Sequence, residues 1–403
     1  MIEFSNLSID ITKKINKLNK KNNGIYFTPY SIIKKNLELL EPYLSNIKFI
    51  LEPSCGSCQF IDILEEKLNN INIIGIEYNK EIYDIIKNNN YISTNIYNYD
   101  FLLYENNKKF DLIIGNPPYY VINKNNINKK YLEFIDGRPN IFSLFILKSL
   151  NLLDNNGILS FILPKNFINC LYYNKLRKYI YDNYTILNII NCDNNKYLET
   201  LQETIIFIIQ NKKPNNSNND FSIILNKFII FNSKENINIL KELYKNSTNL
   251  HNLNFKVYVG NLVWNQHKNL LSNDNSKTRI IYSSNINDNN TLSIQNYKNN
   301  EKKNFINKKG FNELLLVVNR GNGVSKYKFK YSIIDVEYDF LIENHLIYIK
   351  YNNNSSKDNL LLLYNKIINS FENKKTKEFI NIYFGNNAIN TTELNYIFPI
   401  YDI

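Results

Sequence analysis

The strongest constraint on the fold is a regular alternation of short apolar runs with helix-like runs between residues 49 and 209. Short continuous apolar runs predict buried strands, and apolar residues spaced by three and four predict helices. Strands that alternate with helices favour a doubly wound, mainly parallel α/β sheet. We expect strands at 49–51, 71–76, 91–97, 110–114, 157–163, 186–190 and 204–209, of which the last two can pair antiparallel, and helices at 32–40, 60–68, 80–87, 140–153 and 172–181.

Residues 213–220 form the clearest break in this alternation. They are polar, include a proline and show no periodicity, which is typical of a linker. A chain of 403 residues is long enough to bury two cores. We therefore predict a first domain over 1–212, a linker over 213–220 and a second domain of mixed α+β character over 221–403.

Charge and cysteine content narrow the class of protein. A net charge of +11 favours an anionic partner such as nucleic acid, although a basic surface that only confers solubility is an alternative. Four cysteines are too few for a disulfide scaffold, which favours a reducing, cytoplasmic location. The Cys55-x-x-Cys58 pair lacks a second close ligand pair, so we expect no metal. We expect neither a signal peptide nor a membrane span.

The Asn-Pro-Pro-Tyr run at 116–119 directly follows the expected strand at 110–114. Two consecutive prolines cannot continue a strand, because proline lacks the N–H that the ladder needs. Asn116 and Tyr119 are therefore held on a stiff turn at the carboxyl end of a strand, where open α/β sheets bind ligands. An amide oxygen, proline carbonyls and an aromatic ring suit the binding of a planar amino group.

The run at 52–56 is expected to be a tight loop between a strand and a helix, with Gly56 allowing the turn. It has too few glycines for a dinucleotide fingerprint and no phosphate-loop lysine, so a cofactor without phosphates fits better. Glu77 ends the next strand and suits ribose hydroxyls. Asp100 suits an adenine amino group and Phe101 suits the base ring. The alternatives are a plain strand–helix turn for the run at 52–56, a surface carboxylate for Glu77 and a helix cap for Asp100.

Together these features indicate an adenosine-type ligand beside Asn116, and S-adenosylmethionine fits. The same motifs, together with a Phe-Thr-Pro run at 27–29 ahead of the loop, resemble the gamma-class (Taq-like) type II adenine-N6 DNA methyltransferases. Further similarity lies at 137–142, 157–167 and 172–177, and the stretch 260–268 is similar to a segment that begins target recognition in such enzymes. Cys58 departs from the usual glycine of the family; its thiol either crowds the methionine end of the cofactor or only adjusts the loop.

The resemblance implies methyl transfer from S-adenosylmethionine to N6 of a flipped-out adenine in double-stranded DNA. It implies a catalytic domain over 1–212, a DNA target-recognition domain over 221–403, and a modification enzyme whose cognate restriction endonuclease is separate. We expect a monomer. Enzymes that methylate RNA or a protein glutamine amide carry a similar motif and remain the alternative. A DNA-binding protein with a degenerate methyltransferase fold is disfavoured by the intact Asn116, Glu77 and Asp100.

The resemblance also assigns the site residues. Catalysis falls to Asn116, Pro117 and Tyr119, because the Asn116 side-chain oxygen and the Pro117 carbonyl can accept both N6 hydrogens while Tyr119 stacks on the base. The cofactor site comprises Phe27, Thr28, Pro29, Glu52, Pro53, Ser54, Cys55, Gly56, Glu77, Asp100, Phe101, Asn116 and Pro118. The substrate-binding residues are Tyr119, Tyr197 and Trp264, and the basic loop at Arg320 is a further candidate for DNA contact. A surface-loop tyrosine is the alternative for Tyr197, and a solvated turn is the alternative for Arg320. No residue is assigned to a metal.

Overall fold

The computed structural model describes residues 3–88, 95–192, 197–200, 202–321, 327–384 and 388–402. Contacts divide the chain into two compact units, Met1–Asn238 and Ile239–Ile403. No helix within the described ranges is both long and apolar enough to cross a membrane.

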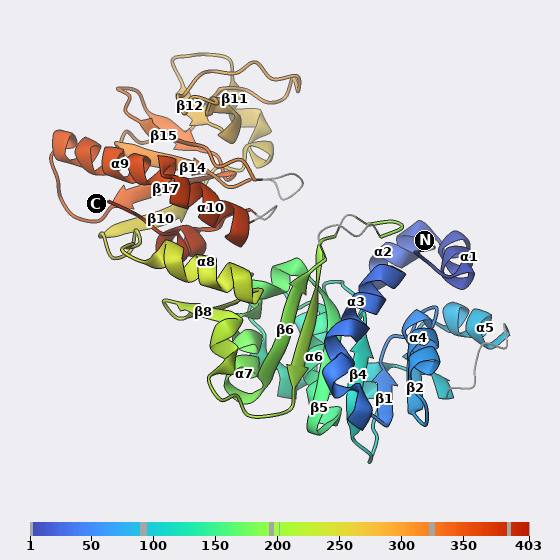
Figure 1. Ribbon diagram of the computed structural model, residues 1–403. Helices are drawn as coiled ribbons and strands as arrows, with labels where there is room; N and C mark the ends of the chain where they lie inside the picture. The colour runs from blue at the N-terminus through green and yellow to red at the C-terminus, as the bar shows by residue number, and fades with distance from the viewer. Residues whose placement is uncertain are drawn as a thin grey trace. The chain divides into compact units, whose positions relative to one another are not determined.

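The first unit is built on a seven-stranded sheet of order β3-β2-β1-β4-β5-β7-β6 (Figure 1). The pairs among β1 to β5 are parallel, whereas β7 pairs antiparallel with both β5 and β6. The expected doubly wound α/β sheet with an antiparallel closing pair is therefore confirmed. Its strands are β1 (Phe49–Glu52), β2 (Asn72–Glu77), β3 (Asn95–Asn98), β4 (Phe110–Gly115), β5 (Leu153–Pro164), β6 (Thr185–Asn191) and β7 (Thr204–Gln210).

Two strands begin more than one residue away from the start that the sequence predicts. The expected strand at 91–97 lies partly outside the described residues, and β3 occupies Asn95–Asn98. β5 begins at Leu153, directly after α6, because a register irregularity between Phe110 and Leu112 accommodates three exposed residues before the buried run. The polar residues at 154–156 hid this first part of the strand from a search for apolar runs.

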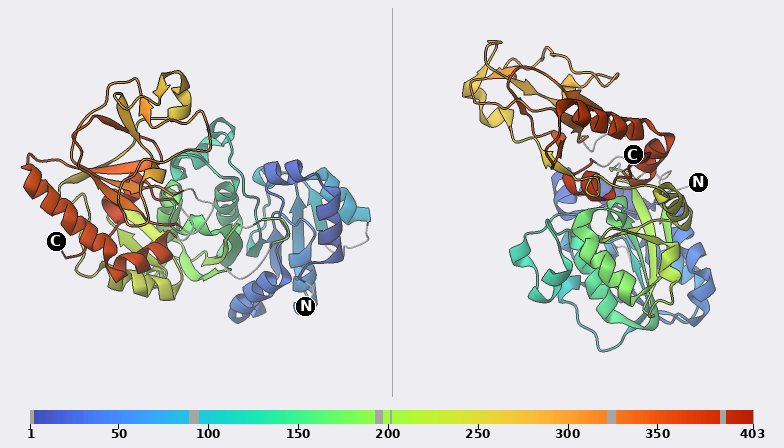
Figure 2. Two further views of the ribbon diagram at one scale, coloured as in Figure 1. Left: turned by 90° about the horizontal axis from the view of Figure 1, so that it is seen from above. Right: turned by 90° about the vertical axis from the view of Figure 1, so that its left-hand side faces the viewer.

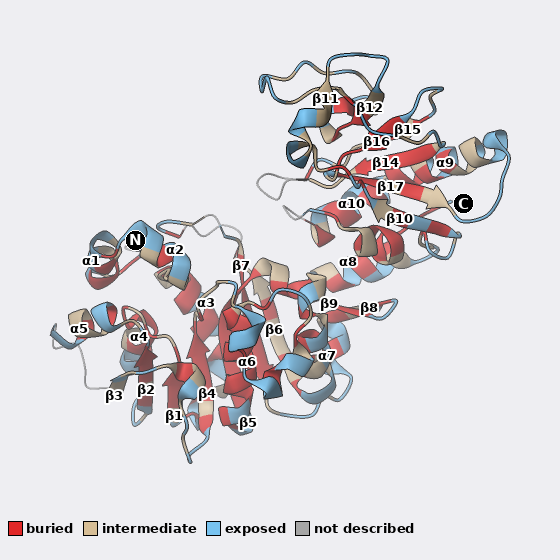
Figure 3. Ribbon diagram, turned by 180° about the vertical axis from the view of Figure 1, so that it is seen from behind, coloured by how far each residue is buried: buried red, intermediate tan, exposed pale blue. Residues whose placement is uncertain are grey.

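Helices cover both faces of this sheet (Figure 2). Alternating residues of β5 show why, because Leu159, Phe161 and Leu163 pack with α6 and α7, whereas Ile158 and Ile162 pack with α3, α4 and α5. Buried residues accordingly gather along the central strands and the facing sides of the helices (Figure 3). The helices are α3 (Tyr30–Leu40), α4 (Gln59–Lys67), α5 (Lys80–Asn88), α6 (Ile141–Leu152) and α7 (Asn174–Asn183).

The N-terminal residues are part of the same core. Helices α1 (Asn6–Lys14) and α2 (Lys17–Asn23) precede α3, and Leu7, Ile11 and Ile15 are buried in the cluster with α3 and α4. Gly24 ends α2 in the left-handed region, with φ of +63°. A Cβ at Gly24 would lie 2.6 Å from the Tyr119 backbone nitrogen, so only glycine lets this segment approach the Asn-Pro-Pro-Tyr turn.

The first unit extends beyond the linker expected at 213–220. The hairpin of β8 (Ser222–Leu225) and β9 (Phe228–Phe231) packs on α7, and Ile229 and Phe231 join its core. Asn218, within the expected linker, is buried; it accepts from the Ile186 N–H and donates to two backbone carbonyls. An asparagine that satisfies buried backbone groups has the same sequence signature as one in a free linker.

The second unit has the mixed α+β character expected. One sheet has the order β10-β17-β14-β15 and another the order β11-β13-β12-β16. Their strands are β10 (Phe255–Val259), β11 (Leu271–Ser272), β12 (Thr278–Ile281), β13 (Phe305–Ile306), β14 (Leu315–Asn319), β15 (Tyr331–Ile334), β16 (Phe340–Ile342) and β17 (Leu346–Tyr351). The helices are α8 (Lys234–Tyr244), which carries the boundary between the units, α9 (Lys357–Glu372) and α10 (Lys374–Tyr383).

Candidate active site

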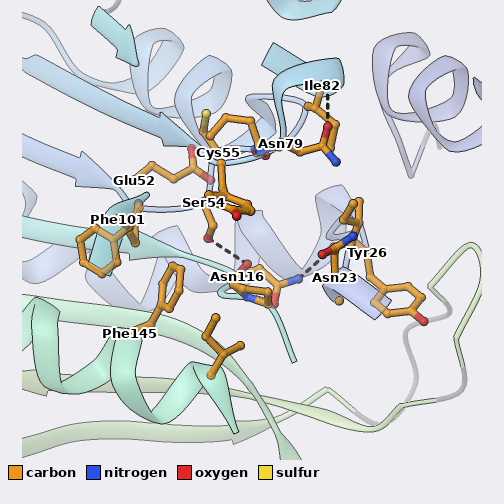
Figure 4. A pocket seen from close by; sticks show the side chains of 18 of the residues that line it. Asn23, Tyr26, Glu52, Ser54, Cys55, Asn79, Ile82, Phe101, Asn116 and Phe145 are labelled. Carbon is orange, nitrogen blue, oxygen red and sulfur yellow. Dashed lines mark hydrogen bonds between the residues drawn. The ribbon is translucent and has the colours of Figure 1, made fainter. Parts of the chain in front are cut away.

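A cavity of about 420 Å³ opens at the carboxyl ends of β1, β2 and β4 (Figure 4). Most of the predicted cofactor residues line it, namely Phe27, Thr28, Glu52, Pro53, Ser54, Cys55, Gly56, Glu77, Asp100, Phe101, Asn116 and Pro118. The described residues that line it do not include Pro29, Pro117 or Tyr119. Residues far apart in the sequence thus meet at one sheet edge, as the strand order requires.

Glu77 lies at the end of β2 and is buried. Its Oε2 accepts from the Gly56 N–H at 3.0 Å, and its Oε1 accepts from the Asn79 N–H at 2.6 Å. Burial raises the pKa of the Glu77 carboxyl to about 7, although both backbone donors lower it. Each oxygen keeps a further lone pair, which is what a ribose diol needs.

Glu52 ends β1 and is only 1% exposed. No protein group among the described residues pairs with its Oε2, which is an uncommon state for a buried carboxylate. Burial raises the pKa of the Glu52 carboxyl well above its ordinary value, and the nearby Cys58, Asp62 and Glu77 add to that effect. A cationic ligand in the cavity would restore the charged form.

The loop between β1 and α4 depends on two residues with positive φ. Gly56 has φ of +53°, and a Cβ there would lie 3.2 Å from the Phe27 ring. Cys58 has φ of +64° at the N-cap of α4, a left-handed conformation that favours glycine. The Cys58 side chain packs in the apolar cluster with α3 and α4 and is not among the described residues that line the cavity. Its thiol therefore adjusts the loop without facing the cavity.

Asp100 and Phe101 form another part of the wall. Asp100 Oδ1 accepts from the Leu102 N–H at 2.9 Å, so the carboxylate caps the short helix Phe101–Leu103 while it also lines the cavity. Phe101 is buried against Phe145 of α6, with ring centroids 4.9 Å apart (Figure 4). Two rings and the aliphatic side chains of α6 give this end of the cavity the apolar surface that a base requires.

Sequence reasoning missed the α6 contribution, which comes from Ile141, Leu144 and Phe145. The only signal was the similarity at 137–142, which marks the start of that helix. It also missed Asn79 and Ile82, which line the cavity beyond β2. Asn79 Oδ1 accepts from the Ile82 N–H at 3.1 Å, as drawn in Figure 4.

Asn116 is held at the end of β4 by four hydrogen bonds. Its Nδ2 donates to the Tyr26 carbonyl at 3.2 Å and to Thr28 Oγ1 at 2.9 Å, and its backbone carbonyl accepts from Ser54 Oγ at 3.1 Å. Its Oδ1 accepts from the Tyr119 hydroxyl at 2.5 Å. The amide nitrogen therefore faces the N-terminal segment, and the amide oxygen faces Tyr119.

The Tyr119 hydroxyl also lies 2.7 Å from the Ile162 carbonyl of β5. A hydroxyl has a single hydrogen to donate, so it serves one of these two acceptors at a time. Burial raises the pKa of the Tyr119 hydroxyl well above its ordinary value, which keeps it protonated and able to donate.

The remaining predicted substrate residues are not among the described residues that line the cofactor cavity. Tyr197 is buried, and its hydroxyl lies 3.0 Å from Thr204 Oγ1 at the start of β7. In the second unit, Trp264 packs against the cluster of Leu262 and Ile280. Arg320 Nη1 donates to the Asn344 carbonyl at 3.2 Å. The structure thus brings the cofactor residues together with Asn116, whereas Trp264 and Arg320 belong to a separate compact unit.

The fold and the site define a Rossmann-like, S-adenosylmethionine-dependent methyltransferase. Its parallel sheet closes with an antiparallel strand, a loop follows β1, a carboxylate ends β2, and an Asn-Pro-Pro-Tyr turn follows β4. The cofactor fits the residues present, because the orphaned Glu52 carboxylate suits a ligand that carries an ammonium and a sulfonium group.

Comparison with known proteins narrows this class. The family described as Eco57I restriction-modification methylase matches residues 5–198. The type II methyltransferase M.CvrRI of Paramecium bursaria Chlorella virus XZ-6E is 27% identical over 382 residues, which cover 93% of each chain. The modification methylase CviBIII of Paramecium bursaria Chlorella virus NC1A is 32% identical over 52% of this chain and 55% of its own length. The prediction of a type II DNA methyltransferase is confirmed by these matches.

Among solved structures, the M protein of the type I restriction enzyme EcoKI aligns with a TM-score of 0.38 and 18% identity, over 46% of this chain and 44% of that chain.

Proposed function

We propose that this methyltransferase acts on N6 of a flipped-out adenine in double-stranded DNA, as a gamma-class modification enzyme. The observation that carries the proposal is the orientation of Asn116, whose amide nitrogen is held by Tyr26 and Thr28 while its amide oxygen faces Tyr119. An amide oxygen beside a proline carbonyl offers two acceptors, which match the two hydrogens of an exocyclic amino group. A ring carbon that accepts a methyl group carries no such pair of N–H donors, so two acceptors at this position favour methylation of an amino group over methylation of a ring carbon.

These two acceptors explain the chemistry expected at N6. The lone pair of an aromatic amine is delocalised into the ring, so the nitrogen is a weak nucleophile. Hydrogen bonds from both N–H groups to Asn116 Oδ1 and the Pro117 carbonyl favour a more tetrahedral nitrogen with a localised lone pair. The same oxygens stabilise the positive charge that grows on N6, because their dipoles are already oriented. Neither residue forms a covalent intermediate.

The cofactor would be held by Glu77 at its ribose hydroxyls, by Asp100 and Phe101 at its adenine, and by Glu52 near its cationic end. S-adenosylmethionine supplies a methyl group on a positively charged sulfur. Tyr119 would stack on the extruded base, which provides roughly 1–3 kcal/mol toward a flipping cost of a few kcal/mol. We further propose that a separate cognate endonuclease cleaves the unmodified site.

The test compares Asn116→Ala with the wild type. Transfer of tritium from labelled S-adenosylmethionine to DNA, followed by nucleoside chromatography, should show N6-methyladenine for the wild type and no product for the variant. Binding of S-adenosylmethionine by the variant should stay within about threefold, since Glu77, Asp100 and Glu52 remain. Substantial DNA methylation by Asn116→Ala, or label found in RNA or protein in place of DNA, would refute the proposal.

A further inference from the structure

The Asn116 amide is pinned by groups that lie some 90 residues earlier in the chain. The Tyr26 carbonyl can only accept a hydrogen bond, so the group facing it must be the amide nitrogen. This contact shows which end of the amide is the nitrogen. Thr28 Oγ1 accepts the second hydrogen of the same nitrogen at 2.9 Å. Both hydrogens of Nδ2 are therefore satisfied, and Oδ1, which accepts from the Tyr119 hydroxyl, keeps a further lone pair for a ligand.

A reversed amide would be incompatible with the proposed chemistry. It would direct two N–H donors at an amino group that itself presents two N–H donors, and it would set Oδ1 against the Tyr26 carbonyl. An asparagine side chain without fixed partners reverses readily, because its terminal torsion is broad and nearly two-fold. The orientation seen here must therefore come from the partners and not from the side chain itself.

Thr28 is itself held in place by buried polar contacts. It is only 5% exposed, and its backbone carbonyl accepts from Gln59 Nε2 at 3.2 Å. Gln59 Oε1 in turn accepts from the Ser8 hydroxyl of α1, and Ser8 Oγ lies 2.6 Å from Ser57 Oγ in the cofactor loop. Ser8, Ser57 and Gln59 are all buried. A continuous buried network thus joins α1, the cofactor loop and the Asn116 amide.

We infer that Thr28 is a positioning residue for methyl transfer, which acts by fixing the orientation of the Asn116 amide through its hydroxyl oxygen. The inference rests on the proposed role of Asn116 as acceptor for the target amino group. It gives the Phe-Thr-Pro element a task in catalysis in addition to its place in the cavity wall.

The test compares Thr28→Val, which keeps the shape but removes the hydroxyl, with Thr28→Ser, which keeps the hydroxyl. Thr28→Val should lower the single-turnover rate of methyl transfer to DNA roughly tenfold. This is the loss expected when one hydrogen bond to the amide is removed and part of the population holds the amide in the reversed orientation. Its dissociation constant for S-adenosylmethionine should change less than about threefold, and Thr28→Ser should restore the rate. Thr28→Ala should show the same split if the valine variant does not fold.

Thr376→Val is the matched control, because Thr376 is a fully buried threonine of the second unit whose Oγ1 donates to the Ser370 carbonyl. It should leave the transfer rate unchanged. A wild-type rate for Thr28→Val, or equal losses of rate and cofactor affinity with no rescue by serine, would overturn the inference. The rates are measured as methyl transfer to any DNA base. Methylation of a base other than adenine would therefore refute the proposed function, whereas the role of Thr28 would still be decided by the comparison of rates.

Discussion

At the scale of single residues, Glu77 couples cofactor binding to pH. Its free carboxyl has a pKa near 7 because burial outweighs two backbone donors. Ribose hydroxyls would donate to the charged form and so lower that pKa in the complex. Binding must then release a proton near neutrality, and affinity for S-adenosylmethionine should rise with pH. The dissociation constant should increase by up to about tenfold for each pH unit below 7.

Calorimetry in two buffers of different ionisation enthalpy measures this proton release directly. Glu52 shifts in the same direction, because a cationic ligand favours its carboxylate, so the wild-type profile contains both groups. Glu77→Gln isolates the contribution of Glu77, and it should bind more weakly and lose the component centred near pH 7. Proton uptake on binding, or an unchanged pH profile in Glu77→Gln, would contradict the prediction.

The residues that sequence could indicate are those tied to a strand end. Apolar runs that predict strands come directly before Glu52, Glu77 and Asn116. Parallel strands bring their carboxyl ends to one edge of the sheet, so these three residues are expected to lie close together. The contact between Thr28 and Asn116 joins positions 88 residues apart, and no local pattern encodes it. Phe145 sits on a helix that is buried nearly all round, so its periodicity does not reveal which side faces the cavity.

At the scale of elements, Arg177 joins α7 to the hairpin of β8 and β9. It is fully buried, and its guanidinium donates to the carbonyls of Ile229 at 2.6 Å, and of Phe167 and Cys170 at 2.8 Å. Arg177→Met keeps much of the volume but leaves these carbonyls without their donor. The free energy of unfolding should fall by roughly 3 kcal/mol, as each buried unsatisfied group costs about 1–3 kcal/mol.

Urea denaturation followed by circular dichroism provides the measurement. The adjacent Lys178 serves as control, since its exposed side chain pairs with Asp182, one helical turn further along the same helix. Lys178→Ala should change stability by less than about 0.5 kcal/mol. An Arg177→Met midpoint equal to that of Lys178→Ala would show that the buried guanidinium does not hold the hairpin in place.

Helices and strands were predictable where burial in the core requires apolar residues. The strands of the sheet alternate between two helical layers, and their apolar runs follow from that burial. The segment around Asn218 was not predictable as part of the first unit, because its contribution is made by polar side chains that bond to backbone. The left-handed conformation of Cys58, with φ of +64°, was also not predictable, because cysteine does not favour that conformation as glycine does.

At the scale of the whole molecule, the two compact units are expected to divide the work. The cofactor cavity and Asn116 lie entirely within residues 23–145 of the first unit. Residues of the second unit that we expect to contact DNA, Trp264 and Arg320, form no part of that cavity. Phosphate contacts position a protein on DNA, whereas base-edge contacts choose the sequence. We therefore propose that sequence choice belongs to residues beyond the first unit.

Exchange of residues 239–403 for the corresponding unit of a methyltransferase with another recognition sequence tests this division. The boundary follows the observed contacts, so the β8–β9 hairpin stays with α7. Single-molecule sequencing of DNA from expressing cells should show the new sequence context with the same methylated base, since the first unit keeps Asn116 and its partners. An exchange at residue 221 is the matched control, and it should unfold more easily because it separates Arg177 from the Ile229 carbonyl. A chimera that still methylates the original sequence would place recognition in the first unit.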